Sequence, residues 1–386
     1  MFGGLVKYPG PLFLSICLVN FVFLPKIDKL AAILFNNYVS LKKGKEMKKS
    51  ILYLLAILFT TCCVTSCGDD DENKTTNGGE ETWKELSKTY ENDNLKLTMG
   101  ETGLTAAGKN VKFDAQSATE GKITLTNVLP ETASLEITTT MQEADGVYSF
   151  TGEAEANSNC KVAVNGTIKD GVLSVVFNRT LSGSLVGDWS LVYNNNVAGI
   201  YTNIATGNAQ IDQLINSMAG PVVGQLLAQK VEAVKVNLPE NGVFNVAWRK
   251  TGASEDQSLS AVASMVVLPY TILDGKFVLA LDKNYMTLLS SLLESKLAEL
   301  GLSMDQMTAM LTDLGGYYGV ALNVKEEGNT TTFYADKTLL SPVLTIITPI
   351  LSEKVPENLK PIIEQILPAL SNAETLDLGL TFQKAE

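Results

Sequence analysis

Residues 160–178 read CKVAVNGTIKDGVLSVVFN and carry the clearest fold signal in the chain. Cys160–Ile168 and Val172–Asn178 are runs rich in β-branched and apolar residues, and Asp170-Gly171 stands between them. An Asp-Gly pair favours the positive backbone φ angles of a tight hairpin turn. We therefore expect two antiparallel strands joined by a short turn, within a larger β-sheet.

The residues between Trp83 and this hairpin repeat the same pattern. Short β-runs alternate with turn signals, and Lys122–Thr126 alternates apolar and polar side chains, as a strand with one buried face should. No segment of helical period interrupts the region. The sequence thus predicts an antiparallel β-barrel or sandwich over residues 83–185. Its further strands are expected at Leu95–Met99, Val111–Ala115, Lys122–Val128, Ser134–Thr139 and Val147–Ala156.

Two stretches of this region resemble a known family. Val147–Gly152 (VYSFTG) and Val162–Gly171 (VAVNGTIKDG) are similar to the calycin-like β-barrel domains of Bacteroidetes surface lipoproteins. The resemblance implies a lipocalin-like barrel. It rests on strand and turn patterns, so it implies no particular ligand.

Residues 186–386 mix strands with apolar helical segments, in a mainly β domain with α insertions. Gly187-Asp188-Trp189 resembles the first strand of lipocalin-type barrels, but the arginine that this family packs on its tryptophan is missing, because the last arginine is Arg249. Eight strands in hairpin pairs are expected, the number that closes a small up-and-down barrel. They are Gly187–Tyr193, Ala233–Leu238, Val243–Arg249, Val266–Ile272, Lys276–Leu281, Tyr318–Lys325, Thr330–Asp336 and Thr375–Phe382.

Apolar residues at helical spacing separate these strands. The first segment, 211–227, contains Gly220-Pro221 as an expected break. Ser303–Gln306 has the pattern of a capping box, and Gly315-Gly316 is expected to end the helix that it opens. Ser341-Pro342 is expected to open another helix. That helix covers 343–351, and the remaining helical segments are 288–297 and 359–370.

These helices must bury their apolar faces against the sheet, and two arrangements fit. They either fill the barrel, or they line a cavity for a hydrophobic molecule under an adaptable, methionine-rich lid. A lipid-transfer-like sheet wrapped on long helices is an alternative architecture with the same composition. In the cavity arrangement the candidate lining and lid residues are Leu292, Leu293, Met307, Met310, Ile346 and Ile350.

Residues 47–66 have the pattern of a signal peptide. A basic start precedes an apolar run that is too short to span a bilayer. Val64–Cys67 (VTSC) resembles the bacterial lipobox, which implies cleavage before Cys67 and lipidation of its thiol. Residues 1–46 lie upstream of this complete signal, so we expect Met47 to be the initiator and residues 1–46 to be absent from the mature protein.

An acidic, polar segment follows Cys67. Its first residues resemble the surface-export signal of Bacteroidetes lipoproteins, and residues 67–82 as a whole are expected to form a lipidated tether. The sequence therefore predicts an outer-membrane lipoprotein at the cell surface, with the membrane as a partner through Cys67. The residues of the expected export signal are Gly68, Asp69, Asp70, Asp71 and Glu72.

The composition excludes several classes of function. The chain has no histidine, which removes Ser-His-Asp and Cys-His catalysis. Arg179 and Arg249 are the only arginines and the formal net charge is −12, so nucleic acid is not an expected partner. After processing, Cys160 would be the one remaining thiol, and we expect it to be buried and inert. No metal, cofactor or catalytic residue is expected.

Three functions remain compatible with the sequence. A non-catalytic module for a hydrophobic small molecule requires an apolar pocket. A structural or adhesive module would instead have a filled core with an exposed apolar patch or a free edge strand. A carboxylate-dependent hydrolase needs two buried carboxyl groups that face one cleft. The apolar helices favour the first function, and the sequence indicates no oligomeric state.

Overall fold

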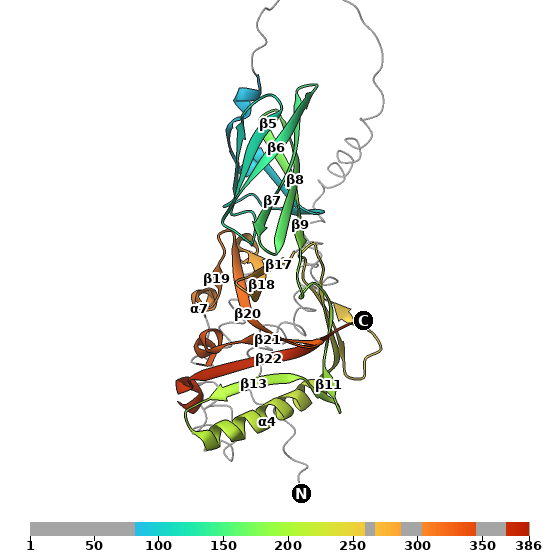
Figure 1. The fold of residues 1–386 in the computed structure, drawn as a ribbon, viewed down its shortest axis with the longest axis vertical. Coiled ribbons are helices and arrows are strands. Elements are labelled where there is room, and N and C mark those ends of the chain that lie inside the picture. The colour runs from blue at the N-terminus through green and yellow to red at the C-terminus, as the bar shows by residue number, and fades with distance from the viewer. Residues whose placement is uncertain (1–81, 259–266, 287–302, 345–367, 386) are drawn as a thin grey trace, which may run out of the picture.

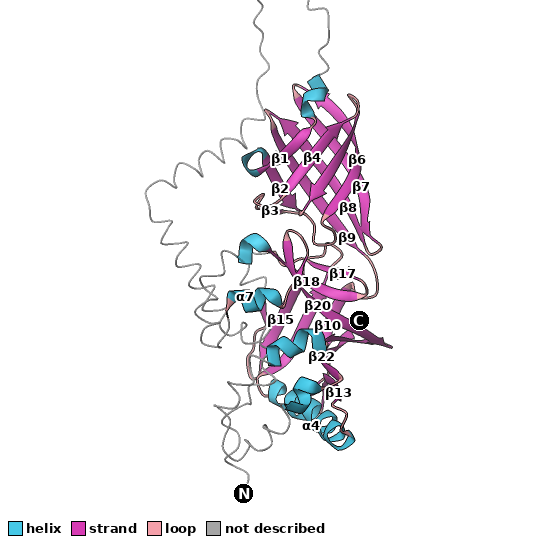
Figure 2. Ribbon diagram, turned by 90° about the vertical axis from the view of Figure 1, so that its left-hand side faces the viewer, coloured by secondary structure: helices cyan, strands magenta, loops and turns pink. Residues whose placement is uncertain are grey.

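The computed structural model describes residues 82–258, 267–286, 303–344 and 368–385. The protein is mainly β, with two large sheets arranged end to end along the long axis of the molecule (Figure 1). The labelled α-helices α4 and α7 lie beside the second sheet (Figure 2). Among the described residues, no helix combines the length and apolarity that a membrane crossing needs.

The first sheet has nine described strands in the order β1-β4-β5-β6-β7-β8-β9-β2-β3. All seven strands expected before residue 185 are confirmed, and β1 and β3 are additions. The prediction that all strands of this sheet are antiparallel was wrong, because β2 pairs with β9 in parallel. The chain crosses from β1 at one edge of the sheet to β2 near the other, which makes β2 run in the same direction as β9. The strands are β1 (Lys88–Glu91), β2 (Leu95–Met99), β3 (Thr102–Leu104), β4 (Asn110–Ala115), β5 (Glu120–Thr126), β6 (Ser134–Ala144), β7 (Val147–Asn157), β8 (Cys160–Lys169) and β9 (Val172–Leu181).

The hairpin formed by β8 and β9 has the expected geometry. Asp170 and Gly171 adopt φ angles of 51° and 76°, and β8 pairs with β9 along its whole length. The inward residues Val162 and Phe177 have no solvent exposure. The alternating pattern therefore places one face of each strand in the core, as the sequence predicts.

The second sheet contains all eight strands expected after residue 185, and its eleven described strands curl into a half-barrel. The prediction of exactly eight strands in a ring was wrong. Strand β22 pairs with β10 near its C-terminal end and with the unexpected β13 along the rest, so the sheet branches there. A separate two-stranded hairpin joins β11 (Tyr193–Asn194) to β12 (Val197–Ala198). The sheet's strands are β10 (Gly187–Leu191), β13 (Ile200–Ala205), β14 (Val231–Leu238), β15 (Asn245–Lys250), β16 (Gln257–Ser258), β17 (Tyr270–Leu273), β18 (Lys276–Asp282), β19 (Thr312–Asp313), β20 (Tyr317–Glu327), β21 (Thr330–Ala335) and β22 (Thr375–Lys384).

The two sides of the half-barrel meet at the end nearest the first sheet. The segment before β15 forms an isolated bridge with the segment before β17, between Val243 and Pro269. The Phe244 N–H donates to the Leu268 carbonyl at 2.9 Å, and the Tyr270 N–H donates to the Gly242 carbonyl at 2.8 Å. These bonds hold the curl closed at this end.

Helix α4 (Ala209–Ala228) covers the outer edge of β13. The Asn216 side chain accepts from the Ile204 N–H at 3.0 Å and donates to the Ile204 carbonyl at 2.7 Å, as a neighbouring strand would. A Cβ at Gly224 would lie 2.3 Å from the Ala198 carbonyl oxygen, so glycine permits this close approach. The expected break at Pro221 was wrong, because the helix runs through it without interruption. Packing on the strand edge outweighs the one backbone hydrogen bond that proline removes.

The other described helical segments differ from the sequence prediction mainly at their ends. The capping box of Ser303 and Gln306 is confirmed at the start of α7 (Met304–Ala309). The helix ends before Gly315-Gly316, which instead form the turn between β19 and β20. Residues 337–344 are helical, and Asp336 accepts the N–H groups of residues 338 and 339, so the expected start at Ser341 was wrong. Asp336 precedes Ser341 in the chain and caps the N-terminus of this helix with its carboxylate, so the helix begins before Ser341. The segment 288–297 lies outside the described residues.

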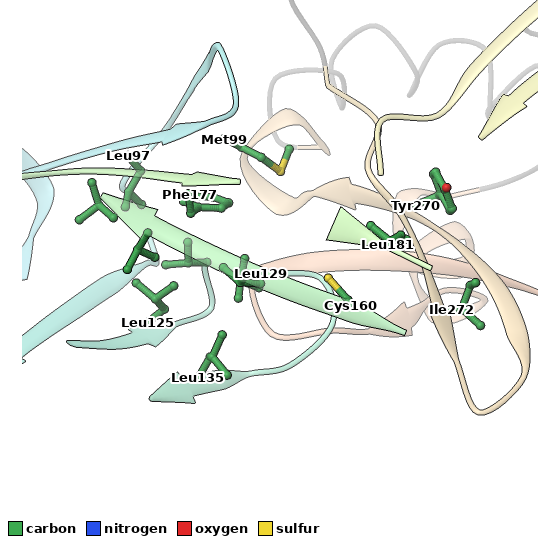
Figure 3. Packing of buried hydrophobic residues seen from close by; sticks show 14 of the residues in the cluster. Leu97, Met99, Leu125, Leu129, Leu135, Cys160, Phe177, Leu181, Tyr270 and Ile272 are labelled. Atoms are coloured by element: carbon green, nitrogen blue, oxygen red, sulfur yellow. The ribbon is translucent and has the colours of Figure 1, made fainter. Parts of the chain in front are cut away.

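One hydrophobic core extends through both sheets. Figure 3 shows Cys160 and Leu181, at the end of the first sheet, beside Tyr270 and Ile272 of β17. The Leu181 N–H donates to the Glu240 carbonyl at 2.7 Å. A smaller second cluster joins α4, β13, β22 and the helical residues 337–344. The main core continues across the expected domain boundary at residue 185, so the two expected domains pack against each other as one body.

Candidate functional site

Most of the site residues expected from the sequence fall outside the described residues. These are Cys67, the acidic run Gly68–Glu72, and the cavity candidates Leu292, Leu293, Ile346 and Ile350. Met307 and Met310 are described, and both are half-buried at the short helix α7. Of the expected lid and cavity residues, the structure thus describes only these two methionines.

The junction contains a fully buried ion pair that the sequence analysis did not foresee. Arg179 at the end of β9 donates through Nε to Glu131 Oε1 at 2.9 Å, and neither side chain is exposed. The same guanidinium donates to the carbonyls of Gly242 and Tyr270 in the second sheet. A guanidinium with its rigid fork of donors suits such a site. Arg179 therefore ties the first sheet to both sides of the half-barrel.

Cys160 lies against this ion pair and has the character of an inert thiol. Burial raises its pKa to about 12, and the negative charge of Glu131 acts in the same direction, while Arg179 opposes it. A thiolate is the reactive form of cysteine. The expected structural role of Cys160 agrees with its burial and its raised pKa.

A second buried ion pair lies at the junction, beside Tyr317. The Lys109 amino group is 2.7 Å from Asp282, and their side chains are 1% and 3% exposed. The Tyr317 hydroxyl donates to the Val128 carbonyl at 2.9 Å, and burial followed by the charge of Asp282 raises the tyrosine pKa. A Cβ at Gly316 would lie 2.0 Å from the backbone oxygen of residue 127. Polar and steric contacts thus fix the two sheets relative to each other.

The inner face of the half-barrel carries a chain of aromatic side chains. Phe333 on β21 lies 5.2 Å from Phe277 and 5.8 Å from Phe382 between ring centroids, both in edge-on geometry. Phe277 also contacts Phe244 and Tyr270 at 6.0 and 5.7 Å. These residues follow the alternation of strands that the sequence predicts. The sequence signal that could have identified them is a phenylalanine at an inward position on three of the expected strands, at 277, 333 and 382.

Several apolar neighbours on the same inner face are only half-buried. Val324 and Leu380 stand opposite Phe333 in the two adjacent strand pairs, so all three side chains project to one side. Phe333 is 9% exposed, and its two neighbours are more exposed still. Inward apolar groups in a filled interior would be fully buried. Val324 and Leu380 pack against the main core and still keep part of their apolar surface unburied.

Trp189 is 4% exposed, and its indole N–H donates to the Leu185 carbonyl at 2.8 Å, as expected for a core tryptophan. The amino group of Lys384, near the end of β22, lies 5.4 Å from the centre of its ring. Next to this pair, a hollow of about 340 Å³ is lined by residues 190–194 and 383–385, mostly through polar atoms. The hollow suits water or a small polar group better than an apolar ligand.

Within the described ranges, no cluster of three or more cysteine, aspartate or glutamate side chains could hold a metal ion. No protein-family model matches the chain, and no curated protein matches it at a significant level. The geometry of the two sheets is thus the basis for any statement about function.

Proposed function

We propose that the protein is a non-catalytic binding module at the outer-membrane surface, where a lipid on Cys67 holds it and the acidic run from Gly68 to Glu72 directs its export. The proposed ligand is a hydrophobic small molecule inside the curl of the second sheet. The observation that carries this proposal is the half-buried apolar surface beside the aromatic chain, around Phe333, Val324 and Leu380. A binding pocket of this kind draws its affinity from apolar burial.

A lipocalin-like relationship is part of the proposal. It is supported by Trp189 on β10, buried near the end of the curl, and by the cation of Lys384 over its ring. Lys384 is the last residue of β22, and its positive charge would take the role of the arginine that the resemblance implies. A cation over a tryptophan face gains electrostatic attraction whether it comes from lysine or arginine.

The binding test uses native mass spectrometry of the purified protein, with residues 1–66 removed and Cys67→Ser to prevent lipidation. A stoichiometric apolar molecule that co-purifies, or one from a panel of fatty acids, phospholipids and bile acids, is the expected result. Val324→Trp should fill the inner face and reduce ligand occupancy. Val176→Trp is the matched control, because Val176 is a half-buried strand residue on the outer face of the first sheet.

A mass without ligand across the whole panel, or equal occupancy in both tryptophan variants, would exclude the proposed pocket. The structural or adhesive function would then be preferred. The anchor has its own test, because metabolic labelling with a fatty acid should mark the wild-type chain and not Cys67→Ala. Protease treatment of intact cells should remove the labelled protein if the cell-surface location is right.

A further inference from the structure

Two tyrosines meet on the outer face of the second sheet. Tyr201 on β13 and Tyr334 on β21 both stand opposite Gly379 of the strand between them, β22. Their ring centroids are 5.3 Å apart, with the planes tilted by 55°. A Cβ at Gly379 would lie 2.3 Å from the Phe333 carbonyl oxygen, so this position takes only glycine. The missing side chain leaves the space above β22 to the two rings.

These tyrosines are not part of the core. Phe333, next to Tyr334, and Leu380, next to Gly379, project to the inner face, so Tyr201 and Tyr334 project to the opposite one. Both rings are half-buried and keep surface in contact with solvent. A solvent-facing aromatic pair presents apolar ring faces that can stack on a ligand.

Hydrogen-bonding groups flank the tyrosine pair and are already held in place. On one side, Asn203 Nδ2 donates to Asp377 Oδ2 at 2.9 Å. On the other, Asn323 Nδ2 donates to Asp336 Oδ2 at 2.9 Å. Burial by itself would raise the pKa of Asp336, but hydrogen bonds from Asn323 and from the following backbone N–H groups hold that pKa below its ordinary value. Both amide–carboxyl pairs therefore keep fixed donors and acceptors beside the rings.

The charge around the rings discriminates between two classes of ligand that bind aromatic pairs. A quaternary ammonium ligand would place its positive charge over the rings. That place is taken, because the Lys325 amino group already lies 5.2 Å from the centre of the Tyr201 ring. Aspartates on both sides disfavour an anionic ligand such as a phosphate. A neutral ligand with an apolar face and a hydroxyl-rich rim suits the site best.

We propose that the outer face formed by Tyr201, Tyr334, Asn203, Asp377 and Lys325 binds a neutral pyranose ring of a glycan. The C–H face of the sugar would stack on the tyrosines, and adjacent hydroxyl groups would bond to the amide, carboxylate and ammonium groups. This site lies on the opposite side of β21 and β22 from the apolar inner face. It is independent of the hydrophobic ligand.

The test uses the full lipidated protein in a zwitterionic detergent, since detergents with sugar headgroups would compete. Saturation-transfer NMR with the methyl glycosides of glucose, galactose, mannose and N-acetylglucosamine, and a glycan array, are the two assays. We expect at least one pyranoside to bind, with its C–H protons receiving saturation from aromatic protons. Tyr334→Ala should weaken binding by about tenfold, because it removes one stacking face.

Asp377→Asn is the second variant, and it changes a single acceptor without altering shape. It should weaken binding while leaving the thermal unfolding curve unchanged, so a loss cannot be assigned to misfolding. Tyr318→Ala is the matched control, because Tyr318 is also a half-buried tyrosine beneath a lysine, with the Lys283 amino group 4.9 Å from its ring centre.

Binding that survives both Tyr334→Ala and Asp377→Asn overturns the proposal, and so does the absence of any bound sugar in both assays. Binding of a tetramethylammonium probe in place of sugars would assign the site to cations and also overturn it. The variants should keep their apolar ligand in native mass spectrometry. Failure of the sugar site is therefore distinguishable from failure of the inner pocket.

Discussion

Replacing Arg179 by methionine removes the guanidinium from the buried junction and keeps much of the side-chain volume. Glu131 then loses the cation that faces it, and its other oxygen, Oε2, already has no hydrogen-bond partner within the described residues. The Tyr270 carbonyl loses the guanidinium donor as well, and the Gly242 carbonyl keeps only its bond from the Tyr270 N–H. Removing one partner of a buried ion pair costs about 3–5 kcal/mol, so Arg179→Met should lower the free energy of unfolding by this amount.

The second arginine provides a matched control. Arg249 pairs with Glu232, and these side chains are 37% and 38% exposed. An exposed ion pair contributes about 0–1 kcal/mol, so Arg249→Met should have little effect. The double variant Arg179→Met, Glu131→Leu removes the stranded carboxylate and should recover at least about 2 kcal/mol, since an apolar pair can replace a buried ion pair.

Equilibrium unfolding in urea, followed by the fluorescence of Trp189 and Trp248, measures these differences, because both indoles are buried. The reasoning is refuted if Arg179→Met unfolds within about 1 kcal/mol of the parent. It is also refuted if the double variant is no more stable than the single one, because the penalty would then not come from the unpaired charge.

Three further predictions concern the thiol, alkaline pH and the glycine at the junction. Cys160 should resist alkylation at pH 8 and react fully in 8 M urea; rapid labelling of the native protein would contradict its burial. The stability that the raised pKa of Cys160 contributes is fully present below the pKa of the unfolded thiol, near 9.0. The free energy of unfolding should fall as the pH rises toward 12, because the folded chain holds that proton and those of Tyr90 and Tyr193, whose pKa values are also raised to about 12. A urea midpoint that stays constant over this pH range would contradict the prediction. Gly316→Ala should cost about 1–3 kcal/mol by overpacking, whereas Gly103→Ala, with open space around the new methyl group, should be near neutral in the same urea titration.

Sequence patterns predict the local structure of this protein well. The Asp170-Gly171 turn and the alternation in Lys122–Thr126 depend on neighbouring residues, and both are confirmed. The capping box at Ser303 is equally local. Pro221 shows the limit of such signals, because contacts between α4 and the edge of β13 decide whether the helix continues.

The features that position the candidate sites come from contacts between distant residues. Lys109 and Asp282 are 173 positions apart, and no local pattern distinguishes either from a surface charge. Tyr201 lies on β13, which the alternation did not reveal because its side chains are polar and apolar without regularity. The pairing of Tyr201 and Tyr334 across Gly379 depends on the branch in the sheet, which only the structure shows.

The position of Thr82 determines how far the second sheet would stand from a membrane anchor. Its hydroxyl lies 2.6 Å from that of Tyr148 at the start of β7, while Asn157 at the other end of that strand donates to the Ile272 carbonyl of the second sheet. Tyr148 and Asn157 are nine positions apart on β7, a length of about 30 Å. With a lipid on Cys67, the first sheet would be a rigid spacer between the bilayer and the second sheet (Figure 1). Both proposed binding faces would then stand in the aqueous medium, beyond the headgroup layer, and a hydrophobic ligand would have to cross water to reach them.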